Sequence, residues 1–431
     1  MALTPNRILI LLLAALVALL AGAAPATAAN GERGASERAT QRGAAARISV
    51  GAGRALKRPG RCSRREVALR KRTGRMRRSQ RRRMKPRQRR VARRARNCRR
   101  RRATGSSAPA APLFWGAWIG DQLTGDEAPW DLSAVDKFEQ MAGKPLSLIH
   151  FSSPFADCSS SSCSYYDFPA GPMDNVRKHG AIPFFSWASQ STPAKLSQPD
   201  FQLGDVISGA HDSYIRSFAE EAHEWGHPFF LRFNWEMNGG WFAWSEGVNG
   251  NQPGEYVAAW RHVHDIFTEV GATNATWVWC PNVDPNGKLQ DLAPLYPGDE
   301  YVDWTGLDGY NWGTNPVRPD RWRSFDDLYR STYEQITETI APSKPLVVGE
   351  VGSTEHGGSK ESWVAEALDT VPANYPKIHG LLWFEKYDDG MDWPIETSSG
   401  ATSAFATGIQ NPAYVGNGYG SLGPGTIQPP S

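Results

Sequence analysis

Cysteine is scarce in this chain, with five residues in 431, and none of them stands at zinc-ligand spacing. Cys158 and Cys163 bracket a serine-rich stretch, which a disulfide could close in an exported protein. Cys280 ends the apolar run Thr-Trp-Val-Trp-Cys and is expected to be a buried thiol rather than a reactive one. Cys62 and Cys98 could pair with each other. The cysteines therefore give no indication of a zinc site.

Acidic and aromatic residues are almost absent from residues 54–102, which hold 26 Lys and Arg, one acid (Glu66) and no Phe, Tyr or Trp. Such charge density with few apolar residues predicts a segment that is disordered when free. Without aromatics it cannot stack on bases, so we expect no sequence-specific nucleic-acid recognition. Non-specific tethering to an anionic cell-envelope polymer is favoured. Alternatives are non-specific nucleic-acid binding, contact with the acidic face of the chain's own domain, and a solvated linker or processed pro-segment.

Long apolar runs are also lacking, since the run from Ile8 to Ala21 is shorter than the ~20 residues that span a bilayer. This run follows Arg7 and precedes Ala26-Thr27-Ala28, which together predict a secretory signal cleaved near Ala28, with an uncleaved anchor as the alternative. The expected location is extracellular, with cell-envelope association through the basic segment. The expected organisation is a signal peptide at 1–28, a disordered basic segment and linker at 29–111, a folded domain at 112–415 and a flexible tail at 416–431.

Residues 103–431 have the opposite charge, with 17 basic against 41 acidic residues, and they contain all 17 Trp. Only this part can bury a large core, and its length suits one α/β barrel. Its net charge of −24 repels phosphate, which argues against a nucleic-acid-associated protein.

Short apolar runs alternate with longer amphipathic stretches from Leu113 onward, as in repeated strand and helix units. Eight strands are expected, at Phe114–Ile119, Leu146–Phe151, Ile182–Trp187, Phe229–Phe233, Thr276–Cys280, Trp304–Leu307, Leu346–Gly349 and Gly380–Phe384. Helices are clearest at Ser213–Trp225, Gly254–Val270, Ser324–Ile340 and Lys360–Leu368. An open doubly wound sheet is the competing fold, but no glycine-rich phosphate loop follows any of the runs. The sequence therefore predicts an α/β fold, a (β/α)8 TIM barrel.

Two glutamates directly follow strand patterns: Glu236 in Leu-Arg-Phe-Asn-Trp-Glu-Met-Asn-Gly-Gly-Trp and Glu350 in Pro-Leu-Val-Val-Gly-Glu-Val-Gly. Both are flanked by apolar residues and Gly, where a carboxylate is poorly solvated unless it has a partner, so a functional role is favoured over a surface one. Cleaving a glycosidic bond with retention needs an acid and a nucleophile whose carboxyls lie roughly 5 to 5.5 Å apart. Because a parallel barrel brings strand ends together, the pair predicts a glycoside hydrolase.

Further polar and aromatic residues near these strand ends are expected to bind substrate, since sugar rings present C–H faces that pack on aromatic planes. The candidates are Arg232, Asn234, Trp235, Asn238, Trp241, Trp244, Asp308, Tyr310, Trp312 and Trp383. For any single Trp, packing in the core is an equally good interpretation.

Three segments, Arg232 to Trp244, Tyr301 to Asn311 and Lys344 to Gly352, resemble glycoside hydrolase family 26, the β-mannanase family. The resemblance covers about residues 112 to 410. It implies a (β/α)8 barrel and a retaining mechanism, with Glu236 as acid/base, Glu350 as nucleophile and Tyr310 in contact with that nucleophile.

One position departs from the family pattern: the residue before the acid/base glutamate is usually His, and here it is Trp235. Indole offers one donor and an apolar face, so the departure bears on the substrate. Endo-β-mannanase-like activity is the first expectation. The alternatives are β-glucanase or β-xylanase activity within the same family, and a non-catalytic carbohydrate-binding barrel.

The implied chemistry needs Glu236 protonated through a raised pKa and Glu350 ionised with the help of donors such as Tyr310 or Arg232. It requires no metal and no cofactor. We expect a monomer that acts on a polysaccharide or oligosaccharide.

Overall fold

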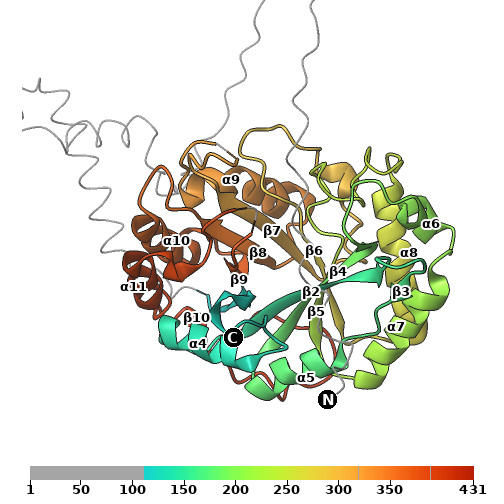
Figure 1. The fold of residues 1–431 in the computed structure, drawn as a ribbon, viewed down its shortest axis with the longest axis horizontal. Coiled ribbons are helices and arrows are strands. Elements are labelled where there is room, and N and C mark those ends of the chain that lie inside the picture. Colours follow the sequence, from blue (N-terminus) through green and yellow to red (C-terminus); the bar gives the residue numbers. More distant parts are fainter. Residues whose placement is uncertain (1–110, 319, 389) are drawn as a thin grey trace, which may run out of the picture. The chain divides into compact units, whose positions relative to one another are not determined.

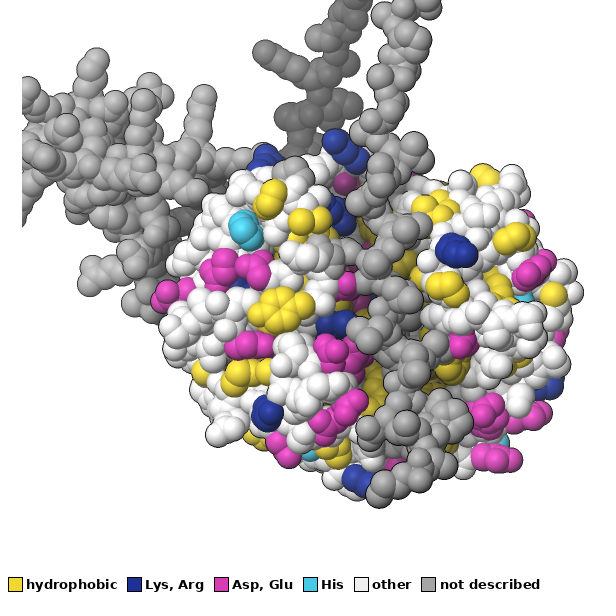
Figure 2. All heavy atoms as spheres, viewed as in Figure 1, with side chains coloured by type: hydrophobic (Ala, Val, Ile, Leu, Met, Phe, Trp, Pro, Cys, Tyr) yellow, Lys and Arg dark blue, Asp and Glu magenta, His cyan; other side chains and the backbone are white. Residues whose placement is uncertain are grey.

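The computed structural model describes residues 111–318, 320–388 and 390–431. The expected signal peptide and basic segment, with Cys62 and Cys98, lie outside these residues. Among the described residues, no helix combines the length and the apolar character needed to cross a membrane. On the face drawn in Figure 2, acidic side chains are more frequent than basic ones, in keeping with the excess of acids in this part of the sequence.

Eight parallel strands close into a barrel surrounded by helices (Figure 1). In chain order they are β1 (Leu113–Ile119), β2 (Leu148–Asp157), β4 (Ile182–Thr192), β5 (Phe229–Phe233), β6 (Ala275–Trp279), β7 (Trp304–Asn311), β8 (Leu346–Ser353) and β9 (Ile378–Glu385). Strand β1 pairs with both β2 and β9, which closes the ring. Two short strands extend the sheet, β3 (Ser164–Tyr165) beside β2 and β10 (Tyr414–Val415) beside β1. The predicted (β/α)8 barrel is confirmed.

Four helices, α7 to α10, lie in the four stretches where helices were expected, and four more complete the helix layer. The helices are α4 (Leu132–Ala142), α5 (Ala170–His179), α6 (Leu203–Ile207), α7 (Asp212–Trp225), α8 (Glu255–Val270), α9 (Phe325–Gln335), α10 (Lys360–Asn374) and α11 (Ser399–Gly408). Helix α7 shows why they form, because Ile215, Phe218, Ala219 and Ala222 recur at helical spacing and are its buried residues. Side-chain caps define several starts, as at α10, where the Ser359 side chain accepts a hydrogen bond from the Ser362 N–H.

Several strands continue beyond their apolar runs. In β2 and β4 the paired residues extend from Leu148 and Ile182 to Asp157 and Thr192. The added residues are mostly polar and resemble loop sequence, but they still form ladder hydrogen bonds with the neighbouring strand. These extensions lie at the carboxyl ends of the strands, so they form the rim on which the site is built.

The cysteine predictions hold within the described residues. Cys158 and Cys163 form a disulfide that closes the serine-rich loop between β2 and β3. Cys280 is a buried free thiol. One barrel glycine is required by close packing, since a Cβ on Gly116 would lie 2.0 Å from the carbonyl oxygen of Leu148.

The tail at 416–431, which the sequence predicts to be flexible, contacts the barrel in this structure. Ile427 is only 4% exposed, its N–H donates to Thr276 Oγ1 at 2.8 Å, and its carbonyl accepts from Trp304 Nε1 at 2.8 Å. The N–H groups of Gly418 and Tyr419 both donate to the Gly180 carbonyl. The Gly and Pro content suggested a loose end, but one buried isoleucine and these hydrogen bonds fix the segment against the amino ends of β6 and β7.

Candidate active site

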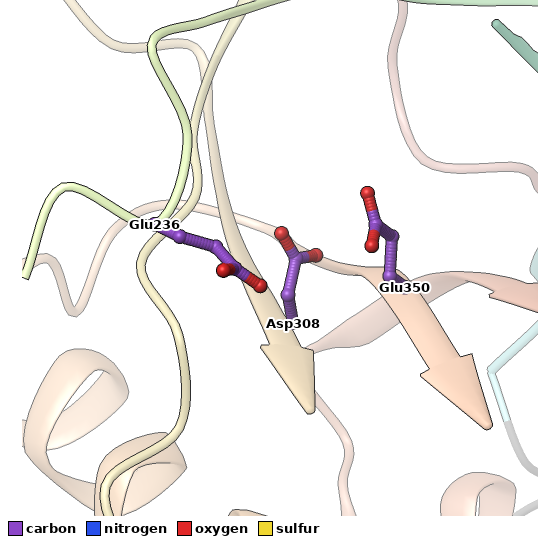
Figure 3. Close-up of side chains that lie close together, drawn as sticks. All are labelled: Glu236, Asp308 and Glu350. Carbon is purple, nitrogen blue, oxygen red and sulfur yellow. The ribbon is translucent and has the colours of Figure 1, made fainter. Parts of the chain in front are cut away.

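Three carboxylates from three barrel strands meet at one end of the barrel (Figure 3). Asp308 lies in β7, Glu350 in β8, and Glu236 follows the end of β5 by three residues. One oxygen from each carboxylate lies within 4.8 Å of the others, and all three side chains are buried. The barrel therefore brings the two predicted catalytic glutamates together, with Asp308 beside them.

The backbone from Asn234 to Glu236 has an unusual conformation. Asn234 has φ 43° and Glu236 has φ 53°, both in the left-handed region that side chains other than glycine seldom adopt. The turn is held by the Glu236 N–H, which donates to the Cys280 carbonyl at 2.8 Å. The Asn234 amide pairs with Ser189, accepting from its N–H at 2.9 Å and donating to its Oγ at 2.8 Å. These bonds hold a strained turn, of the kind that clusters at functional sites.

Both oxygens of Glu236 accept hydrogen bonds. Trp241 Nε1 donates to Oε2 at 2.6 Å and Asn282 Nδ2 donates to Oε1 at 2.6 Å. Burial and then the nearby charge of Glu350 raise the pKa of Glu236 to about 7, although these two hydrogen bonds oppose the shift. Asn282 is fixed in turn by reciprocal hydrogen bonds with Asn238, both of 2.8 Å. Glu236 thus holds a proton over a pH range in which an ordinary glutamate would be ionised.

Glu350 has a different environment, because two protein donors face its carboxylate. Arg232 Nη2 lies 2.5 Å from Glu350 Oε1, and the Tyr310 hydroxyl donates to Oε2. Burial and then the charge of Glu350 raise the pKa of Tyr310, so the phenol keeps its proton and remains a donor. Glu350 therefore accepts from a cation on one oxygen and from a neutral donor on the other.

Arg232 is fully buried and organises the floor of the site. Its Nη1 donates to Asp308 Oδ2 at 2.6 Å and its Nε donates to Ser186 Oγ at 2.7 Å. His150 Nε2 lies 3.2 Å from Nη2, and burial lowers the pKa of this imidazole, so the ring is neutral and can accept a hydrogen bond. The guanidinium carbon lies 4.8 Å from the ring centre of Trp235. Trp235 thus packs on the cation that pairs with Glu350.

Three buried carboxylates could in principle hold a divalent cation, so their free coordination capacity matters. The oxygens of Glu236 and Glu350 all accept from the donors named above, and so does Asp308 Oδ2. The remaining oxygen, Asp308 Oδ1, lies 3.2 Å from Cys280 Sγ, and burial raises the pKa of that thiol, which stays protonated. A metal would have to displace Arg232, itself the cation of the site. The residues fit an ion-paired carboxylate site better than a metal site.

Most of the predicted site residues lie together. Around the carboxylates the structure places Arg232, Trp235, Asn238, Trp241, Asp308 and Tyr310. Trp241 and Trp312 are partly exposed and can present aromatic surface to a ligand. Asn234 is buried and acts through Ser189 on the backbone turn, so a direct substrate contact is not available to it in this structure.

Two predicted sugar platforms are wrong, because Trp244 and Trp383 are buried. The Trp244 indole stacks on Phe242 with 4.3 Å between ring centres and donates to the Trp235 carbonyl. Trp383 packs against Trp363 of α10 and Phe405 of α11, so it faces the helix layer rather than the barrel mouth. Because alternate residues of a strand face opposite sides, its neighbour Phe384 is the side chain that faces the site.

Several site residues were not among the predicted ones. Phe384, Met391 and Trp393 form a small cluster of their own, against which Trp118, Tyr310 and Trp312 pack. The ring centre of Trp393 lies 4.8 Å from that of Tyr310, the donor to Glu350. Asn282 follows a strand at the same end of the barrel as Glu236, a position at which the sequence pattern already predicts polar residues. Trp393 lies in a loop without strand or helix pattern, and no sequence signal places it.

The chain is similar in sequence to known proteins. The family model described as Glycosyl hydrolase family 26 matches residues 115–375. The chain is 32% identical over 298 residues to Endoglucanase H of Acetivibrio thermocellus, covering 68% of this chain and 30% of that protein. It is 26% identical over 247 residues to Mannan endo-1,4-beta-mannosidase of Bacillus subtilis strain 168, covering 54% of this chain and 60% of that protein. The chain thus spans less than two thirds of the length of either relative.

Solved structures share the fold. An endo-beta-1,4-mannanase double mutant of Cellulomonas fimi superposes with a TM-score of 0.53 at 18% identity, over 74% of this chain and 76% of that one. The Bacillus subtilis mannanase BCman superposes with a TM-score of 0.52 at 18% identity, over 75% of this chain and 92% of that one. With a family model that matches most of the barrel, the resemblance seen in the sequence is confirmed: the chain belongs to glycosyl hydrolase family 26.

Proposed function

We propose that this protein is a retaining glycoside hydrolase that cleaves β-linked polysaccharide within the chain, with β-mannan as the first expected substrate. One observation carries the proposal. Two buried glutamates lie close together: burial raises the pKa of Glu236 to about 7, which favours its protonated form, while Glu350 pairs with the Arg232 cation and accepts from the Tyr310 hydroxyl. Two carboxyls with such different environments are the arrangement that acid and nucleophile require.

In the proposed first step, protonated Glu236 donates its proton to the glycosidic oxygen as Glu350 attacks the anomeric carbon. This forms a covalent glycosyl-enzyme and releases the leaving sugar. Glu236, now ionised, then takes a proton from water, which attacks the anomeric carbon and frees Glu350. One oxygen of Glu236 lies within 4.8 Å of one oxygen of Glu350, which supports this route, because the carboxyls of an inverting enzyme are roughly 6.5 to 9.5 Å apart to place a water between them.

Arg232 and Tyr310 have complementary roles in this scheme. Before attack, both hold the Glu350 carboxylate by its two oxygens and so fix its orientation. When one oxygen bonds to the sugar, Glu350 loses its negative charge, and Arg232 still pairs with Asp308. Arg232 therefore keeps its contact with Asp308 throughout the cycle. Asp308 supports the site through Arg232 and takes no part in bond making.

The substrate is proposed from relatives and from one residue. Several relatives are named as mannan endo-1,4-beta-mannosidases, which supports β-mannan. Endoglucanase H, at 32% identity over 298 residues, supports a β-glucan as the second candidate. Trp235, where the resemblance leads us to expect His, puts an apolar face beside Arg232 and leaves room for either assignment.

Release of reducing ends from a panel of polymers tests the proposal. The full chain is incubated with β-mannan, glucomannan, mixed-linkage β-glucan and xylan, beside the Glu350→Gln variant. Glu366→Gln, which changes an exposed glutamate on α10, is the matched control. We expect the native chain and the control to release reducing ends from one polymer and Glu350→Gln to release none. Silence of the native chain on every polymer, with binding retained, would favour a carbohydrate-binding barrel.

The basic segment and the location form a separate proposal. We infer that the protein is secreted and that residues 54–102, with 26 Lys and Arg, hold it on anionic envelope polymers. Deleting residues 54–102 should leave hydrolysis intact and abolish co-sedimentation with isolated cell envelopes. The same co-sedimentation by the full chain should decline steeply with added salt. Unchanged co-sedimentation after the deletion would contradict the tether. We also expect a monomer, which light scattering of the full chain would test.

A further inference from the structure

Arg318 lies between two tryptophans of the active-site mouth. It belongs to the loop between β7 and α9, and its guanidinium carbon is 4.2 Å from the ring centre of Trp312 and 5.8 Å from that of Trp241. Trp241 donates to Glu236, and Trp312 stands two residues after Tyr310, the donor to Glu350. An exposed cation thus lies between aromatic residues connected to both catalytic glutamates.

The guanidinium has no anionic partner within the described part of the chain, where it contacts the two aromatic rings. Arg323, five residues further on, differs, because its Nε donates to Asp320 Oδ2 at 3.0 Å and its Nη2 to Asn286 Oδ1 at 2.7 Å. A guanidinium over an indole ring finds no hydrogen-bond acceptor in the ring, so its N–H groups are free to bind elsewhere. Arg318 is therefore a cation packed over an aromatic ring, and its donors remain available.

The position of Arg318 changes which ligands the active-site mouth can bind. A neutral sugar stacks on an open aromatic face, but Arg318 covers one face of Trp312. A carboxylate matches the planar donor fork of arginine and can accept two parallel hydrogen bonds. The net charge of −24 over residues 103–431 opposes a uniformly anionic polymer, so isolated carboxylates along a largely neutral chain suit the site better.

We infer that Arg318, supported by Trp312 and Trp241, is a specificity-determining residue that binds the carboxylate of a uronic acid unit in a sparsely acidic β-linked glycan. The inference rests on the proposed function, because it names the substrate class of the same site. It differs from a purely structural role for Arg318, in which the cation only holds its loop against Trp312.

The test compares a neutral polymer with its carboxylated form. β-Mannan and mixed-linkage β-glucan are each used unmodified and after oxidation of a small fraction of their C6 hydroxyls to carboxylates. For the full chain at low salt, we expect a kcat/KM about 10-fold higher on the oxidised form of the polymer that is cleaved, the size of one charge-assisted hydrogen-bonded pair. Arg318→Gln should remove this preference. Arg321→Gln removes the same charge from an exposed position three residues along the loop and should keep it.

Other outcomes separate the inference from the proposed function. Equal kcat/KM on both forms, or the same preference in Arg318→Gln and Arg321→Gln, would overturn the inference while the hydrolase assignment stands. If no polymer is cleaved, calorimetric titration of the full chain with β-1,4-mannohexaose and with its singly C6-oxidised form decides. Tighter binding of the oxidised form that is lost in Arg318→Gln supports the site, and equal binding overturns it. Arg318→Lys should recover only part of the preference, because lysine keeps the charge without the planar fork.

Discussion

Arg232 and Glu350 form a buried ion pair, with Nη2 and Oε1 2.5 Å apart, and the same guanidinium pairs with Asp308 at 2.6 Å. One cation therefore serves two of the three carboxylates that meet here. Among the described residues no cation contacts Glu236 directly, and burial raises its pKa to about 7, which favours the protonated form. Glu350 thus has a guanidinium as its partner, whereas burial favours the protonated form of Glu236.

Replacing Arg232 with Met should be severe for both stability and activity. Asp308 and Glu350 would be left buried without their cation, which predicts a loss of about 3 to 5 kcal/mol in the free energy of unfolding. Denaturant unfolding measures this loss. Arg216→Met is the matched control, since it breaks an ion pair with Glu269 on the surface and should change stability little. Comparable losses in the free energy of unfolding of the two variants would contradict the role of Arg232 as the cation that stabilises the buried carboxylates.

The pH dependence of activity should follow Glu236. Because this residue must be protonated to act as the acid, and its pKa is about 7, kcat/KM should fall as the pH rises through about 7. Trp241→Phe removes a hydrogen bond that lowers this pKa, so the alkaline limb should move to higher pH. Initial rates across pH 5 to about 9 locate the limb in each protein. A limb that stays in place or moves to lower pH in Trp241→Phe would argue against Glu236 as the titrating acid.

The free energy of unfolding should also depend on the protonation of Glu236. The pKa of Glu236 is raised in the folded state, so the proton on Glu236 stabilises the folded protein. This stabilisation is fully present below the pKa of the unfolded chain, about 4.3, and is lost as the pH rises through the folded pKa of about 7. Glu236→Gln carries no titrating group, so it should gain stability relative to the native chain between pH 5 and pH 8, on the order of 2 kcal/mol. Urea unfolding at both pH values measures the difference. If Glu236→Gln and the native chain differed in the free energy of unfolding by the same amount at pH 5 and at pH 8, Glu236 would not be the residue that holds the proton.

The C-terminal tail should contribute to stability. Deleting residues 424–431 exposes the pocket of Ile427 and leaves Trp304 Nε1 without its acceptor, which predicts a loss of about 2 to 4 kcal/mol. Deleting only residues 430–431 retains these contacts and serves as the control. Thermal or denaturant unfolding compares the two truncations. Equal stability of both would mean that the tail packs without stabilising the barrel.

The sequence allowed the barrel and its catalytic pair to be predicted for one physical reason. Strands of a closed parallel barrel are apolar runs, and the residues just after each run lie at one end of the barrel. Glu236 and Glu350 come directly after such runs, so their meeting required only the fold. Asn282 could be placed by the same reasoning.

Other features depend on details that a single sequence does not carry. Trp383 and Phe384 are adjacent aromatics in one apolar run, and a shift of one residue decides which faces the site. Trp244 is buried by the local fold of the loop after β5, where it stacks on Phe242. Trp393 reaches Tyr310 from a loop that Lys360 holds through the carbonyls of residues 392, 393 and 394. These contacts arise from tertiary packing, which has no periodicity to detect.

The most direct test of the central claim is the anomeric configuration of the first product. The full chain is mixed with the polymer that it cleaves, and proton NMR follows the new reducing end before mutarotation. Attack by Glu350 followed by water predicts that the β-anomer appears first and the α-anomer only later. Initial release of the α-anomer would show inversion and would contradict Glu350 as the nucleophile.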